Sequence, residues 1–413
     1  MEQGTMHTRN ILPRLRTAIK RSPIIFIKGP RQSGKTTLIK QLQGYYFVTL
    51  DDIRFLQSAL DDPMGFIASL PKPVIIDEIQ RAPQLFLAIK HDIDLNRIAG
   101  RYVLTGSADP LLISKVADSL AGRVEILTLY PFSQGELLGI TDSFIDRAWS
   151  DASLMQLNCQ KIDPAKLYES MVVGGYPSVQ NLSEVDREQW FNDYIATILQ
   201  KDMIDLAAIE HIRDMPKLLS LCAARAGSLV NISELSRDSE ISVSTLNRYL
   251  TMLETLFILI MQQPWSSNLT KRVMKSPKTY LVDTGLLCWL RMLSAKKMMS
   301  SMLHEKGHVV ENFVVNELMK QMTWNSNRIK LYHFRSVGNQ EVDIILERID
   351  GKIIGIEIKS NQQVSAKDCK GLQYLQQSVP HLWHRGFVFY TGDVTIPLVD
   401  GITALPISAL WAK

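Results

Sequence analysis

Eight consecutive residues near the amino terminus have the types and the spacing of a phosphate-binding loop. They fit the pattern G-x-x-x-x-G-K-[ST] and read Gly29-Pro30-Arg31-Gln32-Ser33-Gly34-Lys35-Thr36, followed by Thr37. In such a loop the glycines let backbone N–H groups close around phosphate oxygens, Lys35 reaches the terminal phosphates, and the Thr36 hydroxyl ligates Mg²⁺. The expected ligand is therefore ATP or GTP with magnesium, contacted by residues 29–37.

A pair of acids follows the next strongly apolar run. Residues 73–76 read Pro-Val-Ile-Ile and lead directly into Asp77 and Glu78. Such a pair is common by itself, but this one follows the loop at a distance that fits one intervening strand and helix. We expect Asp77 to hold Mg²⁺ through water and Glu78 to polarise the attacking water.

Other candidates in this region are less specific, and some of them have two interpretations. Thr105 and Ser107 end an apolar strand, where a side chain could sense the γ-phosphate. Arg123 is either an arginine finger that stabilises transition-state charge or one half of a structural ion pair. Asp51 and Asp52 either face the site from a strand end or cap the following helix.

A second constellation lies in the last hundred residues. Glu357 and Lys359 are two apart on one strand and point to the same face, and a hairpin partner can bring Asp343 beside them. Asp343 and Glu357 would ligate Mg²⁺, Lys359 would orient the metal-bound water for phosphodiester cleavage, and Glu311 could complete the ligand set. The alternatives are a surface ion pair on an exposed strand face and a site that only binds nucleic acid.

The elements that must position these residues follow from hydrophobic periodicity. A helix over residues 11–20 precedes a strand at 24–27, and buried strands at 45–50, 73–76 and 101–105 alternate with helices. This alternation predicts an α/β domain over residues 1–140, a parallel sheet wound by helices. Residues 141–205 are expected to form a helical linker or lid, with one turn at Gly174-Gly175-Tyr176-Pro177 that serves as a tight turn or a moving joint.

Residues 206–295 have the pattern of a winged helix-turn-helix. Helices are expected at 215–226, 232–240 and 242–254, with Ser233 and Ser242 as N-caps and Ile241 as the buried turn residue. Strands at 257–261 and 279–283 would flank the wing, whose cations are Lys271, Arg272, Lys275 and Lys278. The third helix would present Ser244, Thr245, Asn247 and Arg248.

Such a wing can grip the phosphates of double-stranded DNA. It can equally be a solvated loop, and winged helices also serve as protein-docking modules. Residues 300–413 then form the last domain.

Composition limits the remaining classes. The chain has 413 residues, of which 46% are apolar and 21% charged, and a net charge of +4. It is expected to be a cytoplasmic protein without membrane contact, because the amino terminus lacks an apolar signal core and apolar runs are far too short to span a bilayer. The four cysteines lie far apart in sequence and are expected to be reduced.

Four runs in residues 10–140 together resemble a known family. GPRQSGKTTL, VIIDEIQRAP, YVLTGSAD and LAGRVEILTLYPFSQGEL occur in order, and VGGYP follows them. They are similar to the prokaryotic AAA-like ATPases that carry a C-terminal restriction-nuclease-like domain of unknown function. The last domain likewise resembles the PD-(D/E)xK nucleases, with Val-Asp343 and Glu357-x-Lys359 in place of the nominal motif. Ser107-Ala108-Asp109 departs from the family, in which a second serine is expected.

The interpretation that combines these features is an ATPase that couples nucleotide state to a DNA-interacting winged helix and a metal-dependent nuclease-like domain. ATP is favoured because no guanine-reading N/T-K-x-D follows the loop. The alternative is a nucleotide-gated DNA- or protein-binding adaptor with an inert nuclease fold. If Arg123 acts in trans, the protein is a homo-oligomer.

Overall fold

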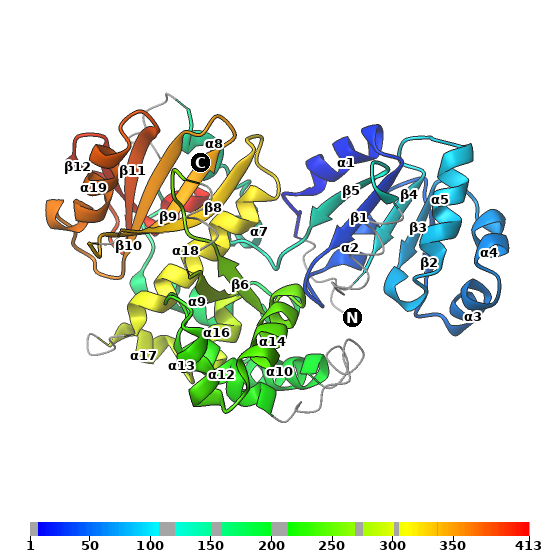
Figure 1. The fold of residues 1–413 in the computed structure, drawn as a ribbon, viewed down its shortest axis with the longest axis horizontal. Helices are drawn as coiled ribbons and strands as arrows, with labels where there is room; N and C mark the ends of the chain where they lie inside the picture. Colours follow the sequence, from blue (N-terminus) through cyan, green and yellow to red (C-terminus); the bar gives the residue numbers. More distant parts are fainter. Residues whose placement is uncertain are drawn as a thin grey trace.

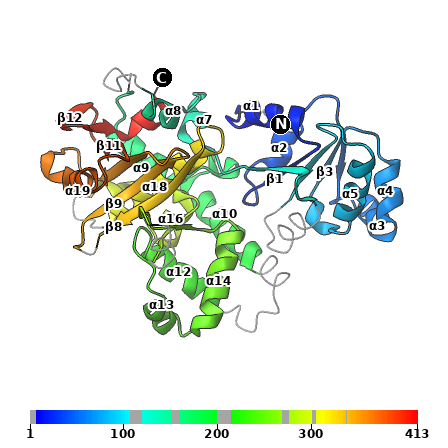
Figure 2. The ribbon, with the colours of Figure 1, turned by 45° about the horizontal axis from the view of Figure 1, so that its top comes forward.

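The structure is a computed structural model that describes residues 7–106, 120–150, 159–199, 214–268, 276–300, 305–336 and 338–412. Figures 1 and 2 show two lobes: residues up to β5 form one, and the middle helices with the C-terminal sheet form the other. Across the described residues, no helix has both the length and the apolar character needed to cross a membrane. Cys159, Cys222, Cys288 and Cys369 are free thiols, as expected.

The first lobe is built on five parallel strands in the spatial order β2-β3-β4-β1-β5. Their bounds are β1 Ile24–Lys28, β2 Tyr46–Thr49, β3 Val74–Asp77, β4 Tyr102–Thr105 and β5 Val124–Thr128. Separate hydrophobic clusters cover the two faces of the sheet. This confirms the predicted parallel α/β fold. The expectation that residues 45–50 are buried was wrong, because β2 is an edge strand and Tyr46 is 41% exposed.

Short helices surround this sheet: α1 Leu12–Arg21, α2 Lys35–Ile39, α3 Ile53–Asp61, α4 Pro63–Ser69, η1 Ile79–Arg81 and α5 Leu85–Leu95. Asp52 is the N-cap of α3, and its side chain accepts a hydrogen bond of 2.9 Å from the Arg54 backbone N–H. Asp51 forms an ion pair with Arg81 near the surface. Of the two interpretations of these acids, the structure therefore shows the cap for Asp52.

The described part of residues 141–205 is mainly helical. It follows α7 Gln134–Leu138 and contains α8 Phe144–Ala148, α9 Pro164–Val173, η3 Pro177–Val179 and α10 Glu184–Thr197. Gly174 has a φ of +75°, and a Cβ atom there would lie 2.2 Å from the Asp283 carboxylate, so only glycine fits this tight turn. The neighbouring Gly175 N–H donates to Asp283 Oδ2 at 2.7 Å.

Three helices and a hairpin follow: α12 Met215–Ala224, α13 Ile232–Ser239, α14 Val243–Thr255, β6 Leu259–Gln262 and β7 Lys278–Leu281. The two strands pair antiparallel. Ser242 caps α14 and Ile241 is buried, as expected. Ser233 was the wrong cap for α13: the helix begins at Ile232, so Asn231 is the N-cap and accepts from the Glu234 N–H at 3.2 Å.

The C-terminal sheet has the order β12-β13-β11-β10-β9-β8. It follows α16 Thr284–Leu290, α17 Ala295–Met299 and α18 Lys306–Met322, and contains β8 Ile329–Arg335, β9 Glu341–Arg348, β10 Ile353–Lys359, β11 Trp383–Tyr390, β12 Ile396–Val399 and β13 Ile402–Pro406. The other elements are η6 Ala366–Cys369, α19 Lys370–Ser378 and η7 Ile407–Trp411. Strands β8 to β10 are antiparallel, whereas β11 runs parallel to β10.

Both faces of this sheet are buried. One hydrophobic cluster includes residues of α18, and another includes residues of α19. The first cluster contains buried residues from each of the three units expected after residue 140. The three units are therefore joined by a shared cluster, and the face of the sheet under α19 has a separate one.

Candidate functional site

The loop at residues 29–36 connects β1 to α2, the strand–loop–helix context that the motif requires. Gly29 has a φ of +156°, and a Cβ atom there would lie 2.1 Å from the Leu129 carbonyl oxygen. Gly34 has a φ of +92°. Lys35 is buried, and its Nζ donates to the carbonyl oxygens of Gly29 at 3.1 Å and Pro30 at 2.8 Å. The carbonyl groups at the start of the loop therefore bind the Lys35 side chain.

The first predicted acid lies directly beside this loop. The Thr36 hydroxyl donates to Asp77 Oδ2 at 3.0 Å, and Thr105 Oγ1 hydrogen-bonds to Asp77 Oδ1. The three come together because β3, β4 and β1 are neighbours in a parallel sheet and deliver their carboxyl ends to one edge. Asp77 is 4% exposed. Glu78 follows in a left-handed conformation with φ +59° and lines the cavity beside the loop.

The residues at this edge fit a magnesium ion. A hydroxyl and a carboxylate within hydrogen-bond distance are the hard oxygen donors that Mg²⁺ prefers beside phosphate oxygens. Thr36 and Asp77 provide them, and the cavity next to the loop has a volume of about 530 Å³. Ser107 lies outside the described residues.

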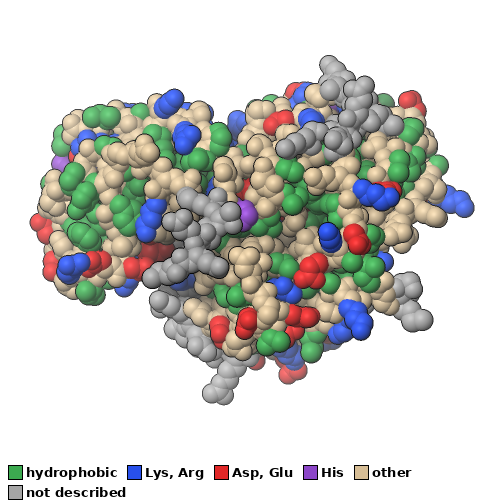
Figure 3. All heavy atoms as spheres, turned by 180° about the vertical axis from the view of Figure 1, so that it is seen from behind, with side chains coloured by type: hydrophobic (Ala, Val, Ile, Leu, Met, Phe, Trp, Pro, Cys, Tyr) green, Lys and Arg blue, Asp and Glu red, His purple; other side chains and the backbone are tan. Residues whose placement is uncertain are grey.

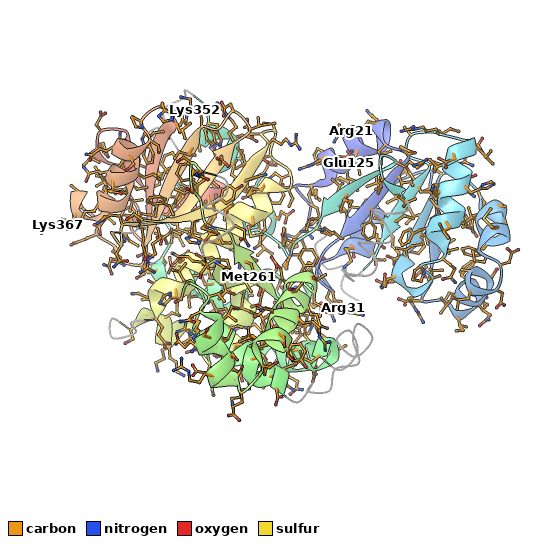
Figure 4. All side chains as sticks on the ribbon, in the orientation of Figure 1. Arg21, Arg31, Glu125, Met261, Lys352 and Lys367 are labelled. Carbon is orange, nitrogen blue, oxygen red and sulfur yellow. The ribbon has the colours of Figure 1, made fainter. Side chains whose placement is uncertain are left out.

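The opposite wall of this cavity comes from the second lobe. The lining residues of η3 and α10, with the residue that follows α10, are Pro177, Ser178, Trp190, Asp193, Tyr194, Thr197 and Ile198. Ser178 Oγ donates to Gln32 Oε1 at 3.2 Å, and the Tyr194 hydroxyl lies 3.5 Å from the Arg31 carbonyl oxygen. Figure 4 shows Arg31 at the boundary between the lobes. These lining residues were not predicted, because nothing in their spacing marks a site.

Arg9 is another residue that the motif search missed. Its guanidinium donates to the Ser33 carbonyl at 2.8 Å, to the Tyr130 carbonyl at 2.6 Å and to Glu136 Oε1 at 3.0 Å. It is 4% exposed. These buried hydrogen bonds hold the loop in position. No local sequence pattern around residue 9 predicts this role of Arg9.

Arg123 lies at the wrong edge of the sheet to reach the loop of its own chain. It precedes β5, and its carbonyl accepts from the Ile24 N–H at the amino end of β1. The loop lies at the carboxyl end of the same strand. The Arg123 guanidinium forms an ion pair with Asp94, 2.6 Å away. The structure therefore shows the ion-pair interpretation and contradicts a role in cis, while a role in trans stays a prediction.

The predicted acids of the last domain do converge. Glu311 on α18 and Asp343 on β9 are bridged by the ammonium of Lys278, which lies 2.9 Å from Glu311 Oε1 and 3.3 Å from Asp343 Oδ1. The Tyr280 hydroxyl donates to Glu311 Oε1 at 2.6 Å, and the Ile358 N–H donates to Asp343 Oδ2 at 3.0 Å. We call Glu311, Asp343, Glu357, Lys359 and Lys278 the acidic cluster.

Glu357 and Lys359 complete this cluster from β10, and their side chains pair at 3.2 Å. Glu357 is 7% exposed, so the alternative of a pair on an exposed strand face was wrong. Burial and the nearby Asp343 raise the pKa of Glu357 well above its usual value. Burial and Asp343 also raise the pKa of Glu311, to about 7. Burial alone would lower the pKa of Lys359, but Glu357 and Asp343 raise it.

Lys278 was expected in the wing and is instead part of this cluster. It begins β7 and is 6% exposed, so it does not offer its charge to a phosphate backbone. Its ammonium takes the oxygens that a metal would need. Among the described residues, no group of three His, Cys, Asp or Glu side chains is arranged to hold a metal ion. In this arrangement the acidic cluster does not suit the magnesium ion that the sequence predicts there.

The surface expected to contact DNA is only partly described. Ser244, Asn247 and Arg248 on α14 are exposed and Thr245 is half-buried, whereas Lys271, Arg272 and Lys275 lie outside the described residues. Figure 3 shows acidic and basic side chains interspersed on one face of the molecule, without a broad basic patch among the residues that it colours.

A buried polar joint connects α7 to α18. Glu317 accepts from the Gln134 N–H at 2.9 Å and from Lys320 Nζ at 2.7 Å, and Lys320 also donates to the Phe132 carbonyl at 2.9 Å. Asp142 lies nearby. Burial, the charge of Glu317 and that of Glu136 raise the pKa of Asp142 to about 8, although a hydrogen bond with Ser133 opposes the shift.

Comparison with known proteins agrees with the class that this geometry defines. Residues 21–138 match the family model of the AAA domain. Together with the loop, this match supports an AAA-like P-loop ATPase fold for these residues. Residues 164–297 and 306–410 match two domains of unknown function, DUF8612 and DUF4143.

The chain belongs to the same family as the uncharacterized protein Rv2008c of Mycobacterium tuberculosis (strain ATCC 25618 / H37Rv). The two are 30% identical over 408 residues, which cover 96% of this chain and 83% of that protein. An uncharacterized protein of Haemophilus influenzae (strain ATCC 51907 / DSM 11121 / KW20 / Rd) is 25% identical over 287 residues, 63% of this chain and 67% of that protein. The solved structure of the Walker-type ATPase paby2304 of Pyrococcus abyssi aligns with a TM-score of 0.41 and 15% identity, over 70% of this chain and 97% of that chain.

Proposed function

We propose that this chain is a magnesium-dependent ATPase that transmits its nucleotide state from the loop at residues 29–36 to the second lobe. The observation that carries the proposal is the composition of the cavity wall, which comes from the loop on one side and from η3 and α10 on the other. A nucleotide there would touch both lobes. If ATP and ADP bind two arrangements of the lobes with different affinity, hydrolysis shifts the population between them.

The roles of the individual residues follow from their positions. The backbone of residues 29–37 would wrap the phosphates, with Lys35 leaving the loop carbonyls to bind the terminal phosphates. Thr36 and Asp77 would hold Mg²⁺, which neutralises phosphate charge when bound. Glu78 would orient the attacking water, and Thr105 would sense the γ-phosphate through its contact with Asp77.

The first test removes the loop lysine. Lys35→Ala should lower kcat/KM for ATP hydrolysis by about 100-fold or more, because a preorganised positive charge at the terminal phosphates is lost. Lys40→Ala is the matched control, since Lys40 is exposed beyond the end of the same helix. Steady-state phosphate release measures both. Parent-like hydrolysis by Lys35→Ala would remove the assignment of the site.

The second test addresses transmission. Spin labels on exposed positions of α5 and α19 should report different interlobe distances with ADP and with a non-hydrolysable ATP analogue. The Lys35→Ala variant should show one distribution with either nucleotide. Equal distances in the parent protein with both nucleotides would contradict the coupling while leaving the ATPase assignment intact.

We further propose that the second lobe acts on double-stranded DNA, with α12–α14 and the β6–β7 hairpin as a winged helix. The order α18-β8-β9-β10-α19-β11 is that expected for a PD-(D/E)xK nuclease, and Asp343, Glu357 and Lys359 meet on it. The pairing of Lys278 with Glu311 and Asp343 favours the second candidate function, an adaptor with an inert nuclease fold.

A plasmid-nicking assay with Mg²⁺ or Mn²⁺, with ATP, with an analogue and without nucleotide, separates these candidates. Cleavage that is lost in Asp343→Ala and Lys359→Ala, with ATP hydrolysis retained, supports a nuclease. No cleavage by the parent protein with either metal supports the adaptor.

A further inference from the structure

Lys278 has an unusual place in the fold. It opens the second strand of the β6–β7 hairpin, yet its side chain ends between Glu311 of α18 and Asp343 of β9 in the C-terminal sheet. The hairpin is fixed at this point by Gln262, whose side-chain amide donates to the Tyr332 carbonyl at 2.9 Å and the Asp343 carbonyl at 3.1 Å. Met261, labelled in Figure 4, marks the neighbouring position on β6.

The ammonium occupies the position between two carboxylates from different elements. Glu311 comes from α18 and Asp343 from β9, and Lys278 is within hydrogen-bond distance of both. The second oxygen of Asp343 is taken by the Ile358 N–H, and Glu357 is paired with Lys359. The two lysines and the Ile358 N–H therefore already contact oxygens of all three acids, and a further cation between Glu311 and Asp343 would be repelled by the Lys278 ammonium.

We propose that Lys278 is a built-in counter-ion that takes the place of a divalent cation, so that the acidic cluster binds metal only when the Lys278 side chain is withdrawn or removed. The inference rests on the proposed nuclease-like assignment of the cluster. Because Lys278 begins β7, the position of this strand would decide whether a metal ion can reach the acids. An ammonium carries one charge and forms three directional hydrogen bonds, whereas a divalent cation would draw the same carboxylates into its coordination shell. The two states exclude each other.

Replacing the charge tests this directly. In the full-length protein without nucleotide, Lys278→Met should bind Mn²⁺ at least 10-fold more tightly than the parent, measured by calorimetry and by the electron paramagnetic resonance of free Mn²⁺. The gain should vanish in Lys278→Met/Asp343→Asn, which localises it to the cluster rather than to Thr36 and Asp77. Lys278→Arg keeps the charge and should bind no more tightly than the parent.

Two further measurements keep the inference decidable. Lys278→Gln retains a hydrogen-bond donor without the charge, and should show the same gain if Lys278→Met fails to fold. In the parent protein, saturating Mn²⁺ should speed hydrogen exchange across residues 278–281. Folded Lys278→Met or Lys278→Gln with parent-like Mn²⁺ affinity, or unchanged exchange in a parent protein whose Mn²⁺ site depends on Asp343, would overturn the proposal. ATP hydrolysis measured alongside separates these results from a failure of the ATPase assignment.

Discussion

At the scale of single residues, the buried charges of this protein are fixed by partners that come from distant parts of the chain. Arg9 holds the phosphate-binding loop through the Ser33 carbonyl and reaches Glu136 on the other side. Glu136 also accepts from the Ser133 N–H at 3.1 Å, which closes a capping box at the start of α7. Asp142 hydrogen-bonds to Ser133 and accepts from the Asn10 side chain at 3.1 Å, but burial and the nearby Glu317 and Glu136 still disfavour its charged form.

Asp142 gives the first prediction at this scale, a pH dependence. Its pKa of about 8 lies above the unfolded value of about 3.9, so the folded state holds a proton that the unfolded state releases between these values. The stabilisation that this raised pKa contributes to the free energy of unfolding is full below the unfolded pKa and is lost as pH rises through the folded pKa. The slope is at most about 1.4 kcal/mol per pH unit.

Asp142→Asn mimics the protonated side chain at every pH. Its stability relative to the parent should therefore rise between pH 6 and pH 8 and level off above. Denaturant midpoints at four pH values measure this difference. A difference that stays constant across the series would show that Asp142 does not titrate in this range.

At the scale of elements, local capping chemistry decides where the helices of the middle region begin. Asn231 and Ser242 cap α13 and α14 with side-chain oxygens that accept from the backbone N–H groups of Glu234 and Thr245. Each cap satisfies one of the four N–H groups that a helix start leaves without a partner. Between the two helices, Ile241 packs into the core.

The caps give a matched pair of substitutions. Asn231→Ala should lower the free energy of unfolding by about 1 kcal/mol, because an N-cap acceptor is removed. Ser233→Ala, two residues further and exposed, should change it by less than about 0.5 kcal/mol. Urea unfolding followed by circular dichroism measures both. Equal effects of the two substitutions would contradict the helix start that the structure shows.

At the scale of the whole molecule, the joint between α7 and α18 connects the region after β5 to the second lobe through buried charges. Glu317 is 0% exposed and Lys320 is 5% exposed, and each also binds a backbone group of residues 132–134. The Gly175 N–H bond to Asp283 ties the turn before α10 to the start of α16 in the same way. These buried hydrogen bonds therefore connect α7 to α18 and the turn before α10 to α16.

Removing one charge of the buried Lys320–Glu317 pair should strongly lower the stability of the protein. Lys320→Met leaves the Glu317 carboxylate buried without its counter-charge, and should lower stability by about 3–5 kcal/mol. Lys330→Met, at an exposed position of β8, is the control and should change it by less than about 0.5 kcal/mol. The double variant Lys320→Met/Glu317→Leu should recover part of the loss. Thermal and urea unfolding measure the series, and a double variant less stable than Lys320→Met would contradict this account.

The sequence by itself determined the features that depend on local pattern. The loop at residues 29–36, the acids at 77 and 78, the parallel sheet and the meeting of Asp343 with Glu357 and Lys359 all follow from motif spacing, hydrophobic periodicity and strand alternation, which act over short stretches of chain. The alternation placed Glu357 and Lys359 on one face but left the burial of that face open.

Only the tertiary structure decided which distant groups meet. The sequence predicts Lys278 as one of four wing cations, but its partner in the structure is Asp343, which lies 65 residues further along the chain. Arg123 is a candidate finger by sequence, but the parallel pairing of β5 with β1 places it at the amino ends of the strands, away from the loop. Arg9, Trp190 and Tyr194 carry no local signal at all. The physical reason is that an ion pair or a cavity wall needs only proximity in space, and chain packing creates that proximity without leaving a pattern in the sequence around either partner.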